Sequence, residues 1–339
     1  MTEPRIENGK QEQNIDCCGR VIDYLRISIT DRCNLRCRYC MPEDISLLPM
    51  SKILTYEEIL EIAEAAAAFG IRHLKVTGGE PLARKGAAEL IAGLKQVPGI
   101  ETVTLTTNGT LLRPQLPALL KAGIDGINIS LDTLDPVKFR EITRFDKLQE
   151  VLDAIEASCA AGIRTKVNTA VMPEINADEA PALAGFAERL PVAVRFIEMM
   201  PIGCGKRCES LDNQVLLSAL RKNYPDLHPV SEQQGYGPAV YYGSEKLLGS
   251  VGFISAVHGK FCKTCNRLRL TATGELKYCL CYEDGLDLRA ILRKDRRAEQ
   301  RQAELHAAFL EAMRKKPEAH CFERPEEISE EKLMSKIGG

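Results

Sequence analysis

The chain has 339 residues, 45% of them hydrophobic and 27% charged, which is the composition of a globular protein of one large domain or two smaller ones. Its formal net charge of −2 excludes the broad basic surface that binds nucleic acid or an anionic membrane. The first 14 residues have no apolar core, and no apolar run reaches membrane-spanning length. We therefore expect no signal peptide, no membrane span and a cytoplasmic location, where thiols stay reduced.

Residues 1–19 are predicted to be a flexible tail, and residues 20–225 alternate β-rich runs with helical stretches. The first strand is predicted at 24–29. The first helix follows at 54–70, where Thr55 and Glu58 form a capping box and Gly70 marks the end. Further strands are predicted at 73–79, 101–109, 126–132, 164–172 and 193–200, and further helices at 85–97, 114–122, 136–160 and 178–190. This alternation predicts parallel βαβ units, in an open doubly wound sheet or a six-stranded part of a (β/α) barrel.

Polar residues at the carboxyl ends of all six strands favour the barrel. They are Arg32–Cys33, Thr77–Pro81, Thr106–Gly109, Ser130–Asp132, Lys166–Asn168 and Glu198–Met200. An open sheet uses mainly its switch point, whereas the strand ends of a barrel converge on one site. We predict an α/β fold, a partial (β/α)6 TIM-type barrel over 20–225. Residues 226–339 read as hairpins and then charged helices at 286–316, so a smaller C-terminal α+β domain is predicted to close the barrel.

Thirteen cysteines in a chain of this kind indicate metal binding rather than disulfides. Six fall into two triplets, Cys33-x3-Cys37-x2-Cys40 and Cys262-x2-Cys265-x13-Cys279. Three thiolates leave one metal position open, which turns a structural metal into a reactive one. An incomplete zinc site or inert buried thiols stay open for the first triplet, and a zinc ribbon completed by Cys281 for the second. The remaining cysteines, Cys17, Cys18, Cys159, Cys204, Cys208 and Cys321, are interpreted as free thiols.

A narrower resemblance rests on eight segments. They are "YLRISITDRCNLRCRYCMPED", "VTGGEPL", "TLTTNGTLL", "INISLDTLD", "KVNTAVM", "RFIEMMPIG", "GFISAVHGKFCKTCNRLRLTATGELKYCL" and the terminal "MSKIGG". Together, over about residues 19–339, they resemble the GTP 3′,8-cyclase family of radical S-adenosylmethionine (SAM) enzymes, which begins molybdenum cofactor biosynthesis. The second triplet and the terminal Gly-Gly pair separate this family from most other radical SAM enzymes.

The resemblance implies two [4Fe–4S] clusters, one on each cysteine triplet. SAM chelates the open iron of the first cluster and is cleaved to a 5′-deoxyadenosyl radical, which takes hydrogen from C3′ of GTP. Attack of C3′ on C8 of the guanine then gives (8S)-3′,8-cyclo-7,8-dihydroguanosine 5′-triphosphate. The guanine occupies the open iron of the second cluster. The implied partners are GTP, SAM, an electron donor and the downstream cyclic pyranopterin monophosphate synthase, with no nucleic acid and no membrane. A homodimer is a further expectation, on which the sequence itself is silent.

The resemblance also implies residue roles, by position. The SAM contacts fall on Tyr39, Gly79, Ser130 and Met200. The GTP contacts fall on Arg26, Lys75, Thr106, Lys166, Arg267, Leu268 and Arg269, and the family usually has arginine where this chain has Lys75. Gly338 and Gly339 would enter the barrel and help arrange the SAM site, whereas a chain end is ordinarily frayed.

Two other functions compete with the cyclase. One is a different radical SAM enzyme with an auxiliary cluster, such as an enzyme that modifies a peptide. The other is a zinc-binding scaffold without catalysis. Iron with sulfide, as opposed to zinc, would separate the scaffold from both enzymes.

Overall fold

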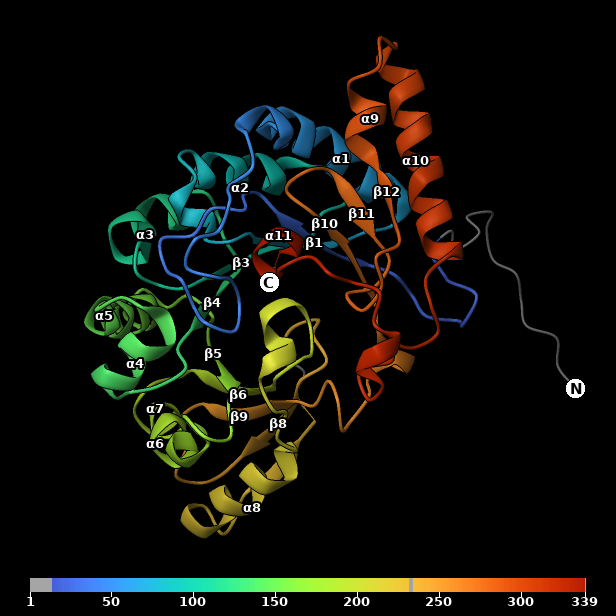
Figure 1. Cartoon of the computed structure of the whole chain (residues 1–339). Coiled ribbons are helices and arrows are strands. Elements are labelled where there is room, and N and C mark those ends of the chain that lie inside the picture. The colour runs from blue at the N-terminus through green and yellow to red at the C-terminus, as the bar shows by residue number, and fades with distance from the viewer. Residues whose placement is uncertain (1–13, 232–233, 339) are drawn as a thin grey trace, which may run out of the picture.

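The computed structural model describes residues 14–231 and 234–338, which form one strongly curved sheet with helices on its outer face (Figure 1). The sheet has 12 strands in the order β12-β11-β10-β1-β2-β3-β4-β5-β6-β9-β8-β7. Most of the N-terminal tail, residues 1–13, lies outside the described residues, so its predicted flexibility stays a prediction.

Six consecutive parallel strands form the centre of the sheet, as predicted. They are β1 (Tyr24–Ser28), β2 (His73–Thr77), β3 (Thr102–Thr107), β4 (Gly126–Ser130), β5 (Thr165–Val171) and β6 (Ala193–Glu198). The prediction of a partial TIM-type barrel is therefore confirmed.

The C-terminal part of the chain extends this barrel at both edges. Strand β10 (Arg267–Leu270) pairs in parallel with β1, and β9 (Ser250–Ile254) pairs in parallel with β6. Antiparallel strands complete the sheet: β11 (Glu275–Lys277) and β12 (Gly285–Asp287) beside β10, and β8 (Val240–Gly243) and β7 (His228–Val230) beside β9. The domain boundary at 225 stays a prediction, because the sheet runs through it.

Helices cover the outer face of the sheet (Figure 1). They are α1 (Tyr56–Phe69), α2 (Ala87–Gln96), α3 (Leu112–Lys121), α4 (Pro136–Thr143), α5 (Leu148–Ala160), α6 (Ala180–Ala184), α7 (Phe186–Arg189) and α8 (Asn213–Asn223). The predicted capping box of α1 is present, with Thr55 and Glu58 as its two members. The single helix predicted at 136–160 is wrong: the chain breaks at Arg144, whose φ of 65° is left-handed. Arg144 Nη1 donates to the backbone oxygen of Arg36, so this break supports the first cysteine loop.

Three more helices follow the second triplet, namely α9 (Leu288–Leu292), α10 (Ala298–Arg314) and α11 (Met334–Ile337). Helix α10 packs on α1, where the rings of Phe69 and Phe309 stack with centroids 5.7 Å apart. Helix α11 lies near β1 at the centre of the molecule, so the last described residues lie inside the barrel (Figure 1). No helix in the described ranges is both long and apolar enough to cross a membrane.

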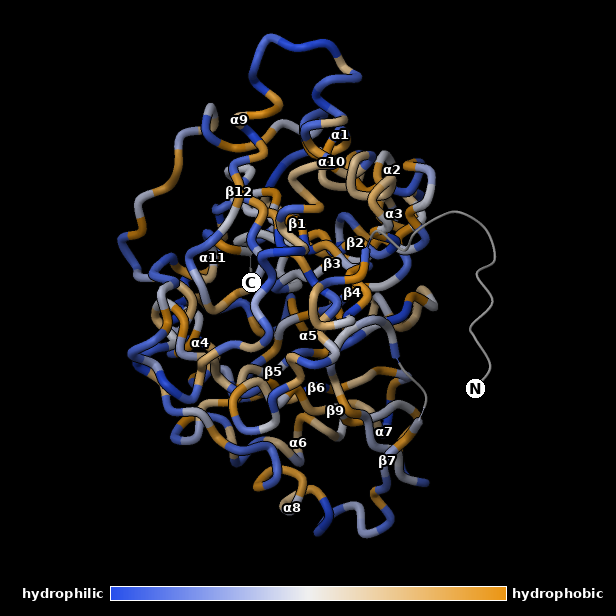
Figure 2. Tube along the Cα trace, turned by 90° about the vertical axis from the view of Figure 1, so that its right-hand side faces the viewer, coloured by the Kyte–Doolittle hydropathy of each residue, from blue (hydrophilic) through white to orange (hydrophobic). Residues whose placement is uncertain are grey.

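Alternation along each strand divides apolar from polar side chains. In β1 and β2, Leu25, Ile27, Leu74 and Val76 are fully buried in the main hydrophobic core. Apolar residues accordingly follow the central strands, and hydrophilic residues gather in the outer loops (Figure 2). The residues between these apolar positions face the barrel interior, which the packed core does not fill. This interior therefore holds the candidate site.

Candidate functional site

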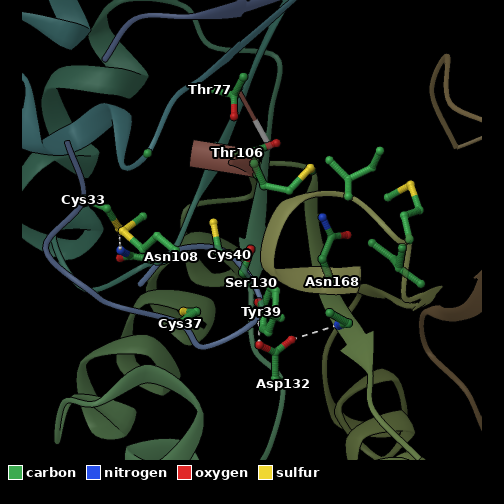
Figure 3. A pocket seen from close by; sticks show the side chains of 18 of the residues that line it. Cys33, Cys37, Tyr39, Cys40, Thr77, Thr106, Asn108, Ser130, Asp132 and Asn168 are labelled. Carbon is green, nitrogen blue, oxygen red and sulfur yellow. Dashed lines mark hydrogen bonds between the residues drawn. The ribbon is translucent and has the colours of Figure 1, made fainter. Parts of the chain in front are cut away.

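The three thiols of the first triplet line a cavity of about 250 Å³ at the carboxyl ends of the central strands. Figure 3 shows Cys33, Cys37 and Cys40 gathered on one side of it. The lining also includes Thr77, Gly79, Thr106, Ser130, Asp132, Asn168 and Met200. The carboxyl ends of the strands, where the sequence has polar residues, thus meet around one cavity.

Backbone contacts hold the first cysteine loop in place. The Arg36 and Arg38 amides donate to the backbone oxygens of Thr143 and Ile142 at the end of α4, at 3.0 and 2.9 Å. Asn108, in the loop after β3, donates to Cys33 Sγ at 3.7 Å (Figure 3). The loop is thereby fixed from two sides, by a helix end and by a neighbouring strand end.

Buried acidic groups surround the first triplet. Burial raises the pKa of the Cys33 thiol to about 11, and the Glu80 carboxylate adds to this shift. Burial likewise raises the pKa of Cys40 to about 12. Asp132 accepts hydrogen bonds from Tyr39 Oη and the Ala170 amide, both at 2.8 Å, and burial raises its pKa to about 6. Arg36, whose Nη1 donates to the Cys33 backbone oxygen at 2.6 Å, lowers the pKa of Cys33 less than burial raises it. A bound cationic group would add positive charge that favours the thiolates.

The four residues predicted to contact SAM all line this cavity, namely Tyr39, Gly79, Ser130 and Met200. At Gly79 the chain passes so close to the first cysteine loop that an added Cβ would lie 2.4 Å from the Arg32 backbone oxygen. The Gly79 amide donates to the Thr30 backbone oxygen at 2.7 Å. Only glycine permits this approach, so the residue joins the ends of β1 and β2.

A second cavity of about 110 Å³ lies toward the amino ends of the same strands. Six cationic side chains line it: Arg26, Lys75, Arg164, Lys166, Arg195 and Arg267. Among its described lining residues there is no Asp or Glu. The two cavities share Arg26, Thr106, Asn168 and Ile197, so they are two halves of one interior.

The cations of the second cavity face one another across the strands. With its oxygen turned toward them, the Asn128 amide accepts from Lys75 Nζ at 2.5 Å and from Arg195 Nη2 at 3.0 Å. Burial lowers the pKa of Lys75, and the charges of Arg195 and Arg26 lower it further. Burial and Arg195 lower the pKa of Lys166 to about 7. A polyanion in this cavity would relieve both the desolvation and the mutual repulsion.

Arg195 and Arg164 are members of this cation group that the sequence interpretation missed. Arg195 stands in the middle of β6, "AVRFIE", where a buried parallel strand is otherwise apolar. Its guanidinium donates to Asn168 Oδ1 from Nε at 2.9 Å and from Nη2 at 2.5 Å. Arg26 was assigned through the family resemblance. A lone arginine in an otherwise apolar strand is a signal in the sequence itself that could have identified Arg195.

The second triplet lies where β10 and β11 meet the chain segment 316–321. Arg20 Nη1 donates to the Cys262 backbone oxygen at 2.9 Å. Lys316, only 3% exposed, donates from Nζ to the backbone oxygens of Arg267 and Tyr278, both at 2.8 Å. Burial opposes ionisation of Cys265, but Arg267 and Lys316 outweigh it and lower the pKa of this thiol to about 6. The second triplet thus has a cationic setting.

Arg267 and Arg269 of β10 face the barrel interior, whereas Leu268 between them faces the main hydrophobic core. Arg269 lines the first cavity and Arg267 lines the second. Leu268, between them, is fully buried in the main hydrophobic core. The structure therefore does not bring the Leu268 side chain into either cavity, although its neighbours Arg267 and Arg269 each line one.

The C-terminal tail reaches the same interior. Arg269 Nη1 donates to the Gly338 backbone oxygen at 3.1 Å. Gly338 has a φ of 91°, and an added Cβ would lie 2.7 Å from Ser28 Cβ, at the end of β1. Met334, four residues earlier, lines the first cavity. The predicted residue Gly339 lies outside the described residues.

The donor chemistry of both triplets fits iron–sulfur clusters. All 13 cysteines lie in the described part of the chain and are free, and three thiols in one place are soft ligands suited to iron and sulfide. Within 14–231 and 234–338, no three His, Cys, Asp or Glu side chains are gathered closely enough to hold a single metal ion. A four-iron cluster places its thiolates around a larger core. Cys281, the proposed fourth ligand of a zinc ribbon, contacts Cys321.

Two protein families match the chain. The Radical SAM superfamily matches residues 27–187, and the family described as Molybdenum Cofactor Synthesis C matches residues 192–322. The GTP 3′,8-cyclase 1 of Pseudomonas aeruginosa is 45% identical over 329 residues, covering 96% of this chain and 99% of that protein. The GTP 3′,8-cyclase of Clostridium perfringens strain SM101 is 40% identical over 325 residues, with coverage of 96% and 99%.

A solved structure shares the fold at much lower identity. Streptococcus suis SuiB bound to S-adenosylmethionine superposes with a TM-score of 0.60 and 13% identity, over 88% of this chain and 76% of that one. This likeness supports the fold alone. The two cyclases carry the functional comparison.

Proposed function

This chain belongs to the GTP 3′,8-cyclase family of radical SAM enzymes, and we propose that each half of its interior holds one of the two ligands of that reaction. The enzyme is a lyase that converts GTP to (8S)-3′,8-cyclo-7,8-dihydroguanosine 5′-triphosphate, the first step of molybdenum cofactor biosynthesis. Its cofactors are SAM and two [4Fe–4S] clusters.

The first half of the interior is proposed to hold SAM. Cys33, Cys37 and Cys40 would bind three irons of a cluster, and together with SAM this cluster supplies a 5′-deoxyadenosyl radical when bound. Asp132, fixed by Tyr39 and the Ala170 amide, would place negative charge beside the cationic sulfonium and amino groups. The close approach of the backbone at Gly79 would leave room for the methionine end. Ser130 and Met200 would complete this wall.

The second half is proposed to hold GTP. Cys262, Cys265 and Cys279 would bind the second cluster, whose open iron takes the guanine. Arg26, Lys75, Lys166 and Arg267, with the missed Arg195, would hold the triphosphate, since each charge-assisted hydrogen bond contributes about 1.5–3 kcal/mol. Thr106 and Asn168 line both halves and would lie beside the ribose between them. Arg269 would act from the first half, next to Gly338.

One observation carries this assignment. The first cavity is lined by the buried carboxylates Asp132 and Glu198 beside Arg26 and Arg269. The second is lined by six cations with no Asp or Glu among its described lining residues, and the two are joined inside one barrel. A sulfonium and a triphosphate placed accordingly would bring the SAM 5′ carbon and the ribose toward the shared residues. Radical abstraction reaches only atoms at near-attack distance, about 3–3.5 Å between reacting atoms. The geometry therefore favours one ribose hydrogen over its neighbours.

Isotope transfer tests the assignment directly. The reconstituted enzyme is given GTP deuterated at C3′, C2′ or C4′, and 5′-deoxyadenosine is analysed by mass spectrometry. We expect label from C3′ only. Label from another ribose position, or SAM cleavage without uptake from GTP, would remove the proposed arrangement and favour a different radical SAM reaction, such as peptide modification.

The remaining partners are proposals as well. We propose that a one-electron donor reduces the first cluster and that cyclic pyranopterin monophosphate synthase takes the product. A cytoplasmic location and a homodimer complete the proposal, to be tested by cell fractionation and by light scattering of the full chain.

A further inference from the structure

Two buried cysteines belong to neither triplet and contact each other. The sulfur atoms of Cys281 and Cys321 lie 3.3 Å apart, although the residues are 40 positions apart in the chain. Their exposed fractions are 0% and 1%. They lie in a small hydrophobic cluster, separate from the main core, that also includes Ile202, Phe322 and Ile337. The proposed reaction uses neither thiol.

The pair lies at the contact between two functional segments. Cys281 follows the triplet residue Cys279 by two positions, at the end of the β11 segment. Cys321 follows His320, whose amide donates to Cys262 Sγ at 3.4 Å. From Cys321 the chain continues to the tail that ends beside Ser28. A covalent bond here would therefore join the second triplet to the C-terminal tail segment.

Backbone contacts already align the two sulfurs. The Cys321 amide donates to Cys281 Sγ at 3.4 Å. The Glu330 amide donates to the Cys281 backbone oxygen at 3.3 Å. Glu330 is itself held by an ion pair with Lys277 at 2.5 Å, in which both side chains are fully buried. The segment 321–330 thus contacts residues 277–281 at both of its ends, through Cys321 and through Glu330.

We propose that Cys281 and Cys321 form a redox modification site, a dithiol that oxidises to an intramolecular disulfide and fastens the C-terminal segment to the second triplet. The sulfurs must approach from 3.3 Å to about 2.05 Å, a shift of roughly one ångström. The inference does not depend on the proposed GTP and SAM sites, because it concerns two thiols outside both cavities.

The oxidant class is a peroxide. One thiol attacks the O–O bond of hydrogen peroxide and becomes a sulfenic acid, with release of one water. The sulfur of the second thiol then attacks the sulfenic sulfur, so that an S–S bond forms and a second water leaves. Two thiols lose two electrons and two protons in total, and one peroxide is reduced to two waters. A small dithiol reductant reverses the step by exchange.

Burial sets the speed of this oxidation. Cys281 and Cys321 are 0% and 1% exposed, so peroxide and reductant reach the two sulfurs slowly. Cys17 and Cys18, by contrast, are exposed and have sulfurs 3.9 Å apart. We expect the buried pair to react more slowly than this exposed pair and, once linked, to be reduced more slowly.

Disulfide mapping of the full chain tests the proposal. Cluster-loaded and cluster-free protein are treated with hydrogen peroxide, free thiols are alkylated, and unreduced peptides are analysed by mass spectrometry. We expect a peptide that links Cys281 to Cys321, two hydrogens lighter than the reduced pair and lost after dithiothreitol. Hydrogen exchange in residues 321–338 should slow in the linked wild type.

Two variants serve as controls. Cys321→Ala should abolish both the link and the slower exchange, whereas Cys159→Ala, which removes a thiol elsewhere, should preserve both. If Cys321→Ala does not fold, the wild-type map alone decides. Full alkylation of Cys281 and Cys321 after Cys17 and Cys18 have been oxidised would overturn the proposal. A link from Cys281 to Cys279 in place of Cys321 would overturn it equally.

Discussion

The two cysteine triplets contribute the same number of thiols to opposite electrostatic surroundings. Burial raises the pKa of Cys33 to about 11, and it also raises the pKa of Cys262 in the second triplet. At Cys265, however, Arg267 and Lys316 outweigh burial and lower the pKa to about 6. The carboxylates Glu80 and Asp132 lie near the first triplet together with Arg36, whereas Arg267 and Lys316 lie near the second. The cysteine spacing alone does not predict these different surroundings, because they depend on residues outside the two triplets.

This difference fits the charges of the two ligands. A sulfonium with an amino group suits the cavity that Asp132 lines, and a triphosphate suits the cavity that Lys75, Lys166 and Arg267 line. With the ligands placed as proposed, the barrel would sort SAM and GTP by charge. Four experiments test this contrast between the two triplets.

The largest effect should come from removing one thiol from each triplet. Cys33→Ala should abolish SAM cleavage, because the first cluster loses a ligand. Cys262→Ala should keep the first cluster but lose productive GTP binding. Iron analysis should fall from about eight to about four atoms per chain in either variant if both clusters are [4Fe–4S].

Cys281→Ala is the matched control for these variants and should keep both clusters. Full iron and full activity in Cys262→Ala would refute the assignment of the second triplet.

Loss of the tail should abolish cyclisation without altering the fold. Deletion of Gly338 and Gly339 removes the backbone oxygen that accepts from Arg269, a residue that lines the first cavity. We expect unchanged circular dichroism and iron content but no cyclised product by chromatography. If the truncated chain turned over normally, the tail would be an ordinary chain end with no role in cyclisation.

Removal of a single cation from the second cavity should have a moderate effect on GTP binding. Arg195→Leu should weaken GTP binding roughly 10- to 150-fold, because a charge-assisted contact contributes about 1.5–3 kcal/mol. SAM binding should be unaffected. Calorimetry on the cluster-loaded protein measures both, and Arg113→Leu, an exposed arginine paired with Asp153, is the control. Equal weakening of both ligands would contradict the sorting by charge.

The smallest effect concerns the buried lysine beside the second triplet. Lys316→Gln keeps donors for the backbone oxygens but removes the charge, so adding an electron to the second cluster becomes less favourable. We expect its reduction potential to fall by about 60 mV, a tenfold change for one electron. Potentiometric titration followed by electron paramagnetic resonance measures this. Lys315→Gln, an exposed neighbour paired with Glu311, should leave the potential unchanged.

Much of the barrel follows from local sequence signals. The six central strands and the capping box of α1 were predictable, because alternation and capping are short-range patterns. The parallel pairing of β9 and β10 with the barrel was not, since it joins segments far apart in the chain. The break at Arg144 was also missed, because a left-handed arginine has no distinctive sequence signal.

The candidate site was predictable where family motifs cover it. The cysteine triplets and the residues predicted to contact SAM are examples. Lys316 was missed because it follows a charged helix and its role depends on backbone oxygens of distant residues. Leu268 was included through the family resemblance, although alternation in a strand turns its side chain away from the interior that Arg267 and Arg269 face.

The pairing of β1 with β10 has a consequence for how the protein is made. Arg20, just before β1, bonds to the Cys262 backbone oxygen, which lies 242 positions later in the chain. At about 5–20 residues per second, the ribosome needs roughly 12–50 seconds to synthesise that interval. Until then one edge of β1 has no partner from β10, and open strand edges favour aggregation. The nascent barrel thus depends on late-synthesised residues, and we expect C-terminal truncations upstream of β10 to accumulate as insoluble protein.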